Sequence, residues 1–230
     1  RPHCLAARTT ARFVDDQLPR PPLVEADALR RLLSALALET APGPEPDCQL
    51  AAGVAAAASP LAVVCGGPGT GKTTTVARIL GVLLHDRPGL DVALAAPTGK
   101  AAARLGEALQ HHVRQRPELA GTLADLEPRT LHRLLGYAGL DDRFRYGRDQ
   151  RLAHDLVVVD EVSMVDPALL AQLCLALRDD ARLLLVGDKD QLAAVAAGQV
   201  LGDLCRSARP ERGVGPRLAA LADAAAGLRL

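Results

Sequence analysis

A glycine-rich segment with one lysine and four threonines occupies residues 63–75 and could bind the phosphates of a nucleotide. It follows the apolar run 61–65 and has the P-loop spacing, Gly66, four residues, then Gly71, Lys72 and Thr73. Glycines let backbone N–H groups surround phosphate oxygens, and these donors lie at a helix N-terminus, where the dipole favours an anion. The expected binding residues are Gly66, Gly67, Pro68, Gly69, Thr70, Gly71, Lys72, Thr73 and Thr74.

Two side chains of this segment are suited to the rest of a nucleoside triphosphate. The Lys72 ammonium would reach the β- and γ-phosphates, and the Thr73 hydroxyl would hold Mg²⁺. Arginine outnumbers lysine by 24 to 3, and the lysines are Lys72, Lys100 and Lys189. Lysine retained in such a chain indicates positions that need a compact ammonium charge instead of a planar guanidinium. An ordinary glycine turn between a strand and a helix is the structural alternative.

Acidic and amide side chains follow two further apolar runs. The run 156–159 ends in Asp160 and Glu161, and its unbroken apolarity predicts a strand covered on both faces. Asp160 could hold the hydration shell of Mg²⁺, and Glu161 could polarise an attacking water. Gln191 follows the predicted strand 182–186 and is placed to contact a γ-phosphate, while Lys189 could touch phosphate or a neighbouring acid. A strand that ends in a solvated acidic turn is the alternative for 160–161.

Other candidate binding residues lie outside these runs. Gln49 is of the residue type that can read an adenine edge, although it could equally be an exposed helix residue. Thr98 and Lys100 follow the apolar run 92–96 and could grip a backbone phosphate, although Thr98 is also a good helix N-cap. His132 lies in a short predicted helix from 129 to 136, where a surface or core histidine is the alternative.

The composition is that of a globular protein. Its 230 residues are 49% hydrophobic and 2% aromatic, with zero net charge, so any nucleic-acid binding must come from a local patch. The apolar part of the longest uncharged run, residues 50–65, is too short for a membrane span, and no secretory signal precedes it, so the expected location is cytoplasmic. An odd number of cysteines without a C-x-x-C pair favours reduced, buried thiols: Cys4, Cys48, Cys65, Cys174 and Cys205.

The predicted elements alternate between strands and helices, which indicates an α/β fold with a mostly parallel sheet and helices on both faces. Residues 1–22 are expected to be a loop, 24–38 a helix, and 41–46 a proline-rich boundary. Helices are expected over 47–58, 73–85, 98–116 and 166–178, and a solvated loop or hairpin over 137–153. The predicted division is a partial N-terminal helical segment and linker at 1–45, a nucleotide-binding domain at 46–205, and a linker with a terminal helix at 206–230.

Six motifs occur in the order seen in superfamily 1 DNA helicases, which the chain resembles. They are most similar to the RecD family, the alpha subunits of RecBCD helicase-nucleases (exodeoxyribonuclease V). Residues 99–102 and 190–194 are closer to the RecB- and RecC-associated subunits than to the longer RecD-like helicases. The motifs are Gln49 and residues 66–73, 96–102, 130–136, 159–166 and 186–192.

The resemblance implies a RecA-like, three-layer α/β/α P-loop NTPase that acts as a 5′-to-3′ DNA motor in double-strand-break repair. Its implied cofactors are ATP and Mg²⁺, and its implied partners are single-stranded DNA and RecB-like and RecC-like subunits. By the same likeness, Gln49 would read adenine, Gln191 would sense the γ-phosphate, and Thr98, Lys100, Thr130 and His132 would line the single-strand track. Only four Phe and Tyr residues are present, so few stacking platforms are expected.

Such helicases also have a second RecA-like domain with arginines that face the γ-phosphate, and its motifs do not occur in this sequence. An arginine finger contributes roughly 10³ to 10⁵ in rate, so we expect the chain alone to bind nucleotide, hydrolyse it poorly and not unwind DNA. Two alternatives stay open. One is a P-loop ATPase that acts as a switch without DNA, and the other is a non-catalytic assembly subunit with a relic site.

Overall fold

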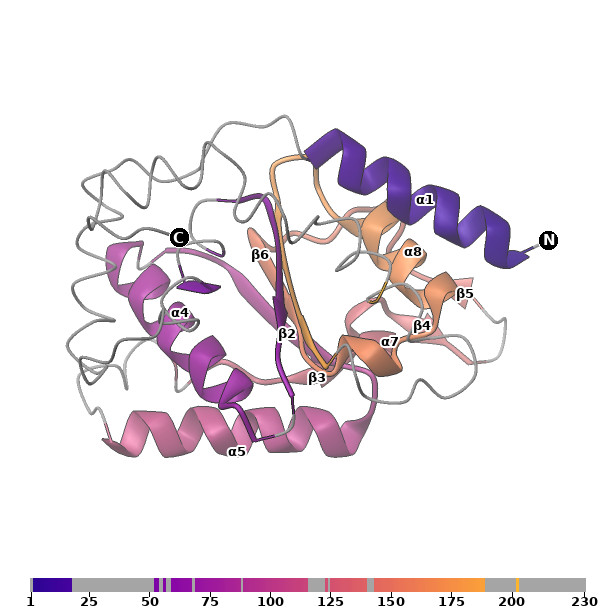
Figure 1. Ribbon diagram of the computed structural model, residues 1–230. Helices are drawn as coiled ribbons and strands as arrows, with labels where there is room; N and C mark the ends of the chain where they lie inside the picture. Colours follow the sequence, from indigo (N-terminus) through magenta and orange to yellow (C-terminus); the bar gives the residue numbers. More distant parts are fainter. Residues whose placement is uncertain are drawn as a thin grey trace, which may run out of the picture.

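One parallel sheet organises the computed structural model of the chain (Figure 1). The structure describes residues 2–17, 52–53, 56, 59–67, 69–87, 89–115, 123, 125–139, 143–188 and 202. Within these residues the sheet has five strands in the order β1-β7-β6-β2-β3, and every adjacent pair is parallel. The strands are β1 (Leu61–Cys65), β2 (Val92–Ala96), β3 (Arg129–Thr130), β6 (Leu156–Val159) and β7 (Arg182–Gly187).

The central strands β6 and β7 are buried along their whole length, as their unbroken apolar sequence predicts. The predicted α/β class and four of the predicted strands are confirmed, because β1, β2 and β6 have the expected bounds and β7 is one residue longer. Residues 129–130 differ, since they pair with Ala95 and Ala96 of β2 as a short edge strand before the next helix begins. The strand order places β7 between the P-loop strand β1 and the carboxylate strand β6.

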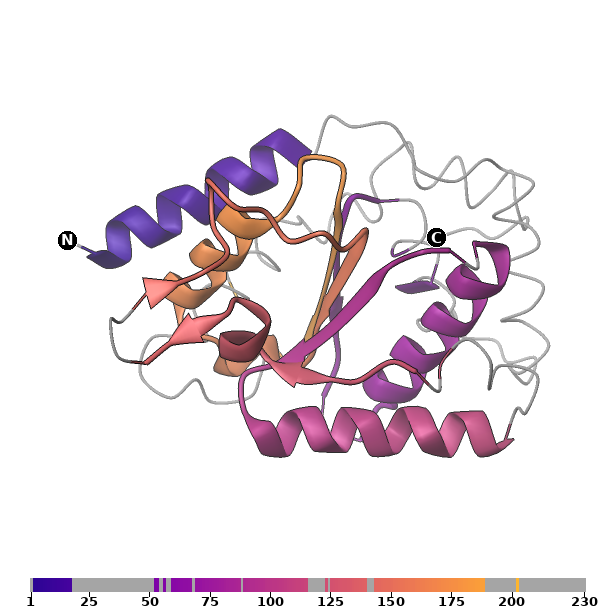
Figure 2. The same ribbon diagram turned by 180° about the vertical axis from the view of Figure 1, so that it is seen from behind.

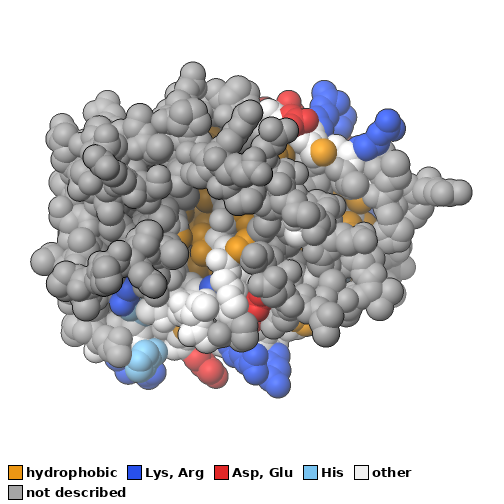
Figure 3. All heavy atoms as spheres, in the orientation of Figure 1, with side chains coloured by type: hydrophobic (Ala, Val, Ile, Leu, Met, Phe, Trp, Pro, Cys, Tyr) orange, Lys and Arg blue, Asp and Glu red, His pale blue; other side chains and the backbone are white. Residues whose placement is uncertain are grey.

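Two long helices, α4 (Lys72–Asp86) and α5 (Gly99–Gln115), cover one face of the sheet (Figure 1). Ile79 and Leu80 of α4 and Leu105 and Leu109 of α5 are buried against Val158 and other strand residues. The outer side of α5 is polar, with exposed Arg104, Glu107 and His111 among others. Figure 3 shows charged side chains of both signs along the lower edge of the molecule, where α5 lies. This one-sided burial explains the long amphipathic sequence of α5.

The other face is covered by α1 (Pro2–Gln17), α7 (Leu131–Leu134), the 3₁₀ helix η2 (Val162–Met164) and α8 (Pro167–Ala176) (Figure 1). Asp166 caps α8, because its Oδ1 accepts a hydrogen bond of 2.7 Å from the Ala168 N–H, and Pro167 occupies the first turn as predicted. Leu169, Leu170 and Leu173 pack with Val157 and Leu185 of the sheet. A second apolar layer therefore completes a three-layer α/β/α arrangement.

The expectation of a loop at residues 1–22 is wrong, because residues 2–17 form α1, which packs against α8. Ala6 and Thr10 are buried and Phe13 is half-buried, a spacing that lies on one side of a helix. Two of these residues are small or polar, so the apolar stripe is weak in the sequence. Pro19, Pro21 and Pro22 follow the helix, and proline disfavours helical geometry in the residue before it. The prolines affect only the residues next to them, so they do not oppose a helix over residues 2–17.

A small hairpin leaves the sheet after α7. Its strands β4 (Tyr137–Ala138) and β5 (Arg143–Phe144) pair antiparallel, with Tyr137 opposite Phe144. Figure 2 shows the hairpin beside α7 and apart from the five-stranded sheet. The hairpin alternative for residues 137–153 is thus confirmed for the paired residues 137–138 and 143–144.

Several predicted features lie outside the described residues, namely Gln49, Pro68, Lys189, Gln191, the helix at 24–38, the boundary at 41–46 and residues 206–230. The proposed domain division therefore stays a prediction. Of the described cysteines, Cys174 is buried as expected, whereas Cys65 is exposed because it ends β1 at the sheet edge. Among the described helices, none is both long and apolar enough to cross a membrane.

An ion-pair network joins the β6 and β7 strands at their amino ends. Arg178 donates to the Asp155 carboxylate at 2.7 Å, and the Asp91 N–H donates to the same carboxylate at 3.1 Å. The Asp91 N–H, followed by Arg178, holds the pKa of Asp155 below its ordinary value. A carboxyl whose pKa is lowered by folding stabilises the fold above its unfolded pKa, and this stabilisation is lost as pH falls through the folded pKa.

We expect Asp155→Asn to lower the free energy of unfolding at pH 7 and to have a smaller effect near pH 3. The physical reason is that Asp155 in the wild type gains protons as pH falls toward its lowered pKa. The wild type then loses part of the charge that the variant lacks at every pH, so the two proteins differ less in stability. Denaturant unfolding at the two pH values measures the difference. Asp179→Asn, at an exposed neighbouring carboxyl, is the control. Equal destabilisation by Asp155→Asn at both pH values would contradict this account.

Candidate functional site

The glycine-rich loop begins where β1 ends and closes at the first residue of α4, at the carboxyl edge of the sheet. The Gly66 N–H donates to the Gly187 carbonyl of β7 at 3.2 Å, which ties the loop to the adjacent strand. The Lys72 ammonium donates to the carbonyl oxygens of Gly66 and Gly67 at 2.6 and 2.7 Å. Lys72 is thus held inside the curve of the loop that the sequence predicted to bind phosphate.

The first glycine of this loop is required by close packing. A Cβ atom built on Gly66 would lie 2.6 Å from Thr70 Oγ1 and 3.4 Å from Lys72 Cγ. The Thr70 hydroxyl in turn donates to the Gly67 carbonyl at 2.9 Å. Any larger residue at position 66 would therefore displace the side chains on the inside of the loop. The spacing of the loop and its place before a helix N-terminus are those of a phosphate-binding loop.

Thr73 and Asp160 come together from separate elements, because α4 begins beside the end of β6. The Asp160 carboxylate accepts a hydrogen bond from the Thr73 hydroxyl, and it lies close enough to Lys72 to feel its charge. A hydroxyl and a carboxylate are hard oxygen ligands of the kind that Mg²⁺ prefers, directly or through water. The two residues predicted to serve a metal ion therefore fit that role in chemistry and in position.

The Asp160 carboxylate is buried, with only 6% of the residue exposed. Burial raises its pKa above the ordinary value, and the adjacent Glu161 charge acts in the same direction. The Glu161 N–H donates to Asp160 Oδ1 at 2.8 Å and opposes the rise, as do Lys72 and Thr73. A buried carboxylate with only partial compensation is costly to the fold, which indicates a position kept for its chemistry.

Glu161 has a strained backbone. Its φ of 52° and ψ of 39° lie in the left-handed region, and it is the one non-glycine residue with positive φ in the part of the chain that the structure describes. Such a conformation costs a bulky residue about 1–3 kcal/mol and is concentrated at functional sites. The residue predicted to polarise water is therefore also the one held in an unfavourable conformation.

A further acid at this edge was not among the predicted site residues. Asp188 follows β7 directly and is 2% exposed, and β7 lies between β1 and β6. The sequence carries the same signal there as at Asp160, an acid placed immediately after an unbroken buried strand. The residue of this segment that was predicted to act in the site, Gln191, lies outside the described residues.

The four residues predicted to contact DNA gather at the ends of β2 and β3. Ala96 pairs with Thr130, so the segment that starts at Thr98 and the segment that starts at Leu131 leave the sheet side by side. Thr98 caps α5 by accepting from the Ala101 N–H at 3.2 Å, and Thr130 caps α7 by accepting from the Arg133 N–H at 3.2 Å. Lys100 and His132 are exposed. Capping accounts for both threonines, but it does not account for the lysine or the histidine.

The residues predicted to bind nucleotide and those predicted to bind DNA are joined through the sheet. The Asp160 N–H donates to the Ala95 carbonyl at 2.9 Å, so the end of the carboxylate strand β6 is bonded directly to the end of β2. Thr98 lies three residues beyond Ala95. Both groups therefore lie at the carboxyl edge of one sheet, where parallel α/β folds place their ligands.

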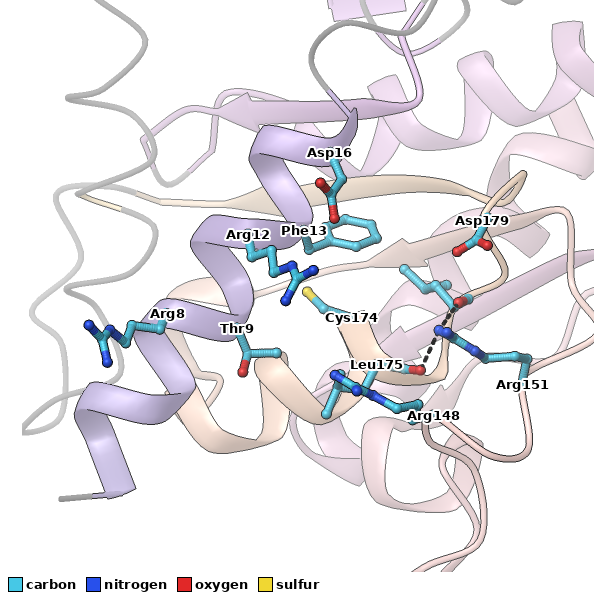
Figure 4. Close-up of a pocket in the computed structure, with 11 residues that line it drawn as sticks. Arg8, Thr9, Arg12, Phe13, Asp16, Arg148, Arg151, Cys174, Leu175 and Asp179 are labelled. Carbon is cyan, nitrogen blue, oxygen red and sulfur yellow. Dashed lines mark hydrogen bonds between the residues drawn. The ribbon is translucent and has the colours of Figure 1, made fainter.

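A separate cleft of about 700 Å³ lies between α1, the end of α8 and residues 148–151 (Figure 4). Arg151 forms one wall and donates to the carbonyls of Leu175 and Leu177, each at 2.6 Å. None of the predicted nucleotide or DNA residues that the structure describes lines it. It lies near the start of β7, at the opposite edge of the sheet from Asp160, and is not the predicted nucleotide site.

The loop after β1, the threonine at the start of α4 and the acid after β6 define a P-loop nucleotide-binding domain on a three-layer α/β/α scaffold. Residues 49–197 match the AAA domain family. This match covers more than half of the chain, and the chain belongs to that family.

Relatives confirm the predicted resemblance to RecD. The RecBCD enzyme subunit RecD of Mycolicibacterium smegmatis is 52% identical over 163 residues, which cover 68% of this chain and 29% of that protein. The ATP-dependent RecD2 DNA helicase of Deinococcus radiodurans is 45% identical over 148 residues, which cover 64% of this chain and 18% of that protein. The chain thus spans less than a third of the length of either relative. Among solved structures, the HK97 bacteriophage large terminase aligns over 82% of this chain and 43% of its own, with 17% identity and a TM-score of 0.47.

Proposed function

We propose that the chain is the ATP-binding part of a 5′-to-3′ DNA helicase subunit of the RecBCD type, acting in double-strand-break repair. The observation that carries the proposal is the meeting of Lys72, Thr73 and Asp160 at the sheet edge where the segment with the exposed Lys100 also begins. Relatives that are named RecD and RecD2 DNA helicase support the class of activity. The direction of movement and the RecB-like and RecC-like partners rest on that likeness.

In this proposal the chain's residues divide the work on ATP. Backbone N–H groups of residues 67 and 69–74 and the Lys72 ammonium bind the phosphates, while Gln49 reads the adenine. Thr73 and Asp160 would hold Mg²⁺, which supplies charge neutralisation at the β- and γ-phosphates. Glu161 accepts a proton from the attacking water, and Gln191 responds to loss of the γ-phosphate.

The DNA part of the proposal assigns four residues to the single strand. Lys100 contacts a backbone phosphate as a point charge. Thr98 and Thr130 lie in the two adjacent segments at the ends of β2 and β3. His132 lies beyond Thr130 on an exposed side of α7. The coupling route is short, because the β6 and β2 strand ends share the hydrogen bond from Asp160 to Ala95.

Single-strand binding by Lys100→Ala tests the DNA part of the proposal. We expect weaker binding to oligonucleotides of every sequence and a shallower salt dependence. One lost phosphate contact on a single strand should reduce the slope of log K against log salt by about 0.7 in magnitude. Fluorescence anisotropy with a labelled oligonucleotide at several salt concentrations measures both. Nucleotide affinity should not change, which controls for folding.

Two results of this experiment favour other functions. If the wild-type chain binds ATP but no single strand, it is a P-loop ATPase switch without a DNA role. If it binds neither ligand although it is folded, a non-catalytic assembly subunit with a relic site is the better description.

A further inference from the structure

Three aromatic rings pack together where α7 meets the β4–β5 hairpin. The ring centroids of His132 and Tyr137 are 5.3 Å apart with an interplanar angle of 78°, an edge-to-face contact. Phe144 closes the triangle, 5.2 Å from Tyr137 and 6.0 Å from His132. These separations are in the range of favourable aromatic pairs. Two of the four Phe and Tyr residues in the sequence thus lie around His132, which is predicted to contact DNA.

The backbone fixes this cluster through the turn between α7 and β4. Gly136 has a φ of 65°, and a Cβ atom there would lie 2.8 Å from Arg145 Cβ, so only glycine fits the turn without strain. The Arg145 N–H donates to the Gly136 carbonyl at 3.2 Å, and the Tyr146 N–H donates to the Leu135 carbonyl at 3.1 Å. The hairpin is therefore bonded to the end of α7 and cannot swing independently of it.

The helix α7 cannot hold the His132 side chain by itself. It is a single turn of four residues, anchored by the buried Leu131 and Leu134 and capped by Thr130, and His132 is on its exposed side. An exposed side chain on such a turn exchanges rotamers freely unless neighbours restrict it. The rings of Tyr137 and Phe144 are the neighbours that the structure provides. Phe144 also packs on the core, whereas Tyr137 is 40% exposed.

We propose that Tyr137 and Phe144 are positioning residues that hold the His132 ring ready for contact with single-stranded DNA, an inference that rests on the proposed function. Fixing a side chain before binding lowers the entropy that binding must overcome. The hairpin thus acts on the DNA through His132, which explains the exposed Tyr137 without a catalytic role.

Tyr137→Ala tests this inference. We expect it to weaken single-strand binding by about three- to tenfold, the range that loss of one aromatic pair allows. Tyr137→Phe keeps the ring and should retain affinity within about twofold. The ring signals of His132, assigned in histidine-labelled protein with His132→Ala, should shift in Tyr137→Ala and not in Tyr137→Phe. A Tyr137→Phe variant as weak as Tyr137→Ala would overturn the inference, because the hydroxyl and not the ring would then matter.

A double-mutant cycle separates positioning from a direct contact. In the His132→Ala background, Tyr137→Ala should cause no further loss beyond about twofold, because its effect passes through the histidine. Additive losses would overturn the inference. Tyr146→Ala is the matched control, since this tyrosine belongs to the same hairpin region and stacks with Arg145 at 5.3 Å instead of with His132. It should leave affinity within about twofold when compared at equal folded fraction.

The Lys100→Ala variant distinguishes failure of the proposed DNA function from failure of the positioning role of Tyr137. If Lys100→Ala weakens single-strand binding while Tyr137→Ala does not, the proposed function stands and the positioning role is wrong. If neither variant changes binding, the DNA function itself is wrong.

Discussion

Lys72→Ala should weaken ATP binding by about 100-fold or more while leaving single-strand DNA binding unchanged. Lys72 is the one predicted phosphate contact whose side-chain charge the structure holds inside the loop, between the carbonyls of Gly66 and Gly67. Hydrogen bonds to charged groups contribute about 1.5–3 kcal/mol each, and Lys72 is expected to bind both the β- and γ-phosphates. Calorimetric titration with a non-hydrolysable ATP analogue and Mg²⁺ measures the loss.

Lys100→Ala is a matched control for this result, because it is the same substitution at one of the other two lysines. It should keep ATP affinity and lose DNA affinity, the reverse of Lys72→Ala. The pair of variants thus assigns the two lysines to different ligands on the same sheet edge. Equal ATP affinity in wild type and Lys72→Ala would show that the glycine-rich loop is an ordinary turn.

Asp160→Asn should make the fold more stable and the nucleotide site less responsive to Mg²⁺. The substitution removes a charge that is buried at 6% exposure, and it keeps an oxygen that can accept from the Thr73 hydroxyl. A gain of about 1 kcal/mol raises the thermal midpoint of a domain of this size by about 2–4 °C. Loss of an outer-shell metal partner typically lowers metal affinity by about 10- to 100-fold.

Two measurements check this pair of effects. Thermal unfolding without ligand gives the midpoint, and ATP titrations with Mg²⁺ and with a chelator give the metal dependence. Asp166→Asn is the control, because asparagine caps a helix as well as aspartate does, so both readings should match the wild type. A lower midpoint for Asp160→Asn, or an unchanged metal dependence, would contradict the role assigned to this carboxylate.

The parts of the fold that could be predicted from sequence are those where one physical requirement dominates. Strands β2, β6 and β7 are almost wholly buried in a parallel sheet, and β1 is partly buried at its edge, so all four have mainly apolar sequences. Because parallel strands end at one edge, the residues that follow them meet in space even when they are distant in the chain. Asp160 and Thr73 were associated with one another on that basis, and the structure brings them into contact.

The features that sequence reasoning missed depend on packing between segments. The helix α1 buries Ala6 and Thr10, and residues so small or polar give a weak apolar stripe. The aromatic cluster depends on a turn at Gly136 that returns Tyr137 and Phe144 to His132, and composition alone suggested few stacking platforms. Asp188, like Asp160, is an acid that directly follows a buried strand, but Gln191 was the residue predicted to act in the site from that segment.

The most direct test of the account is the ATP affinity of the chain with and without saturating single-stranded DNA. The central claim is that both ligands bind one sheet edge, coupled through the hydrogen bond between the ends of β6 and β2. The account predicts that DNA changes the ATP affinity and that ATP changes the DNA affinity by the same factor, as linkage requires. An ATP affinity that is identical with and without bound DNA would contradict it.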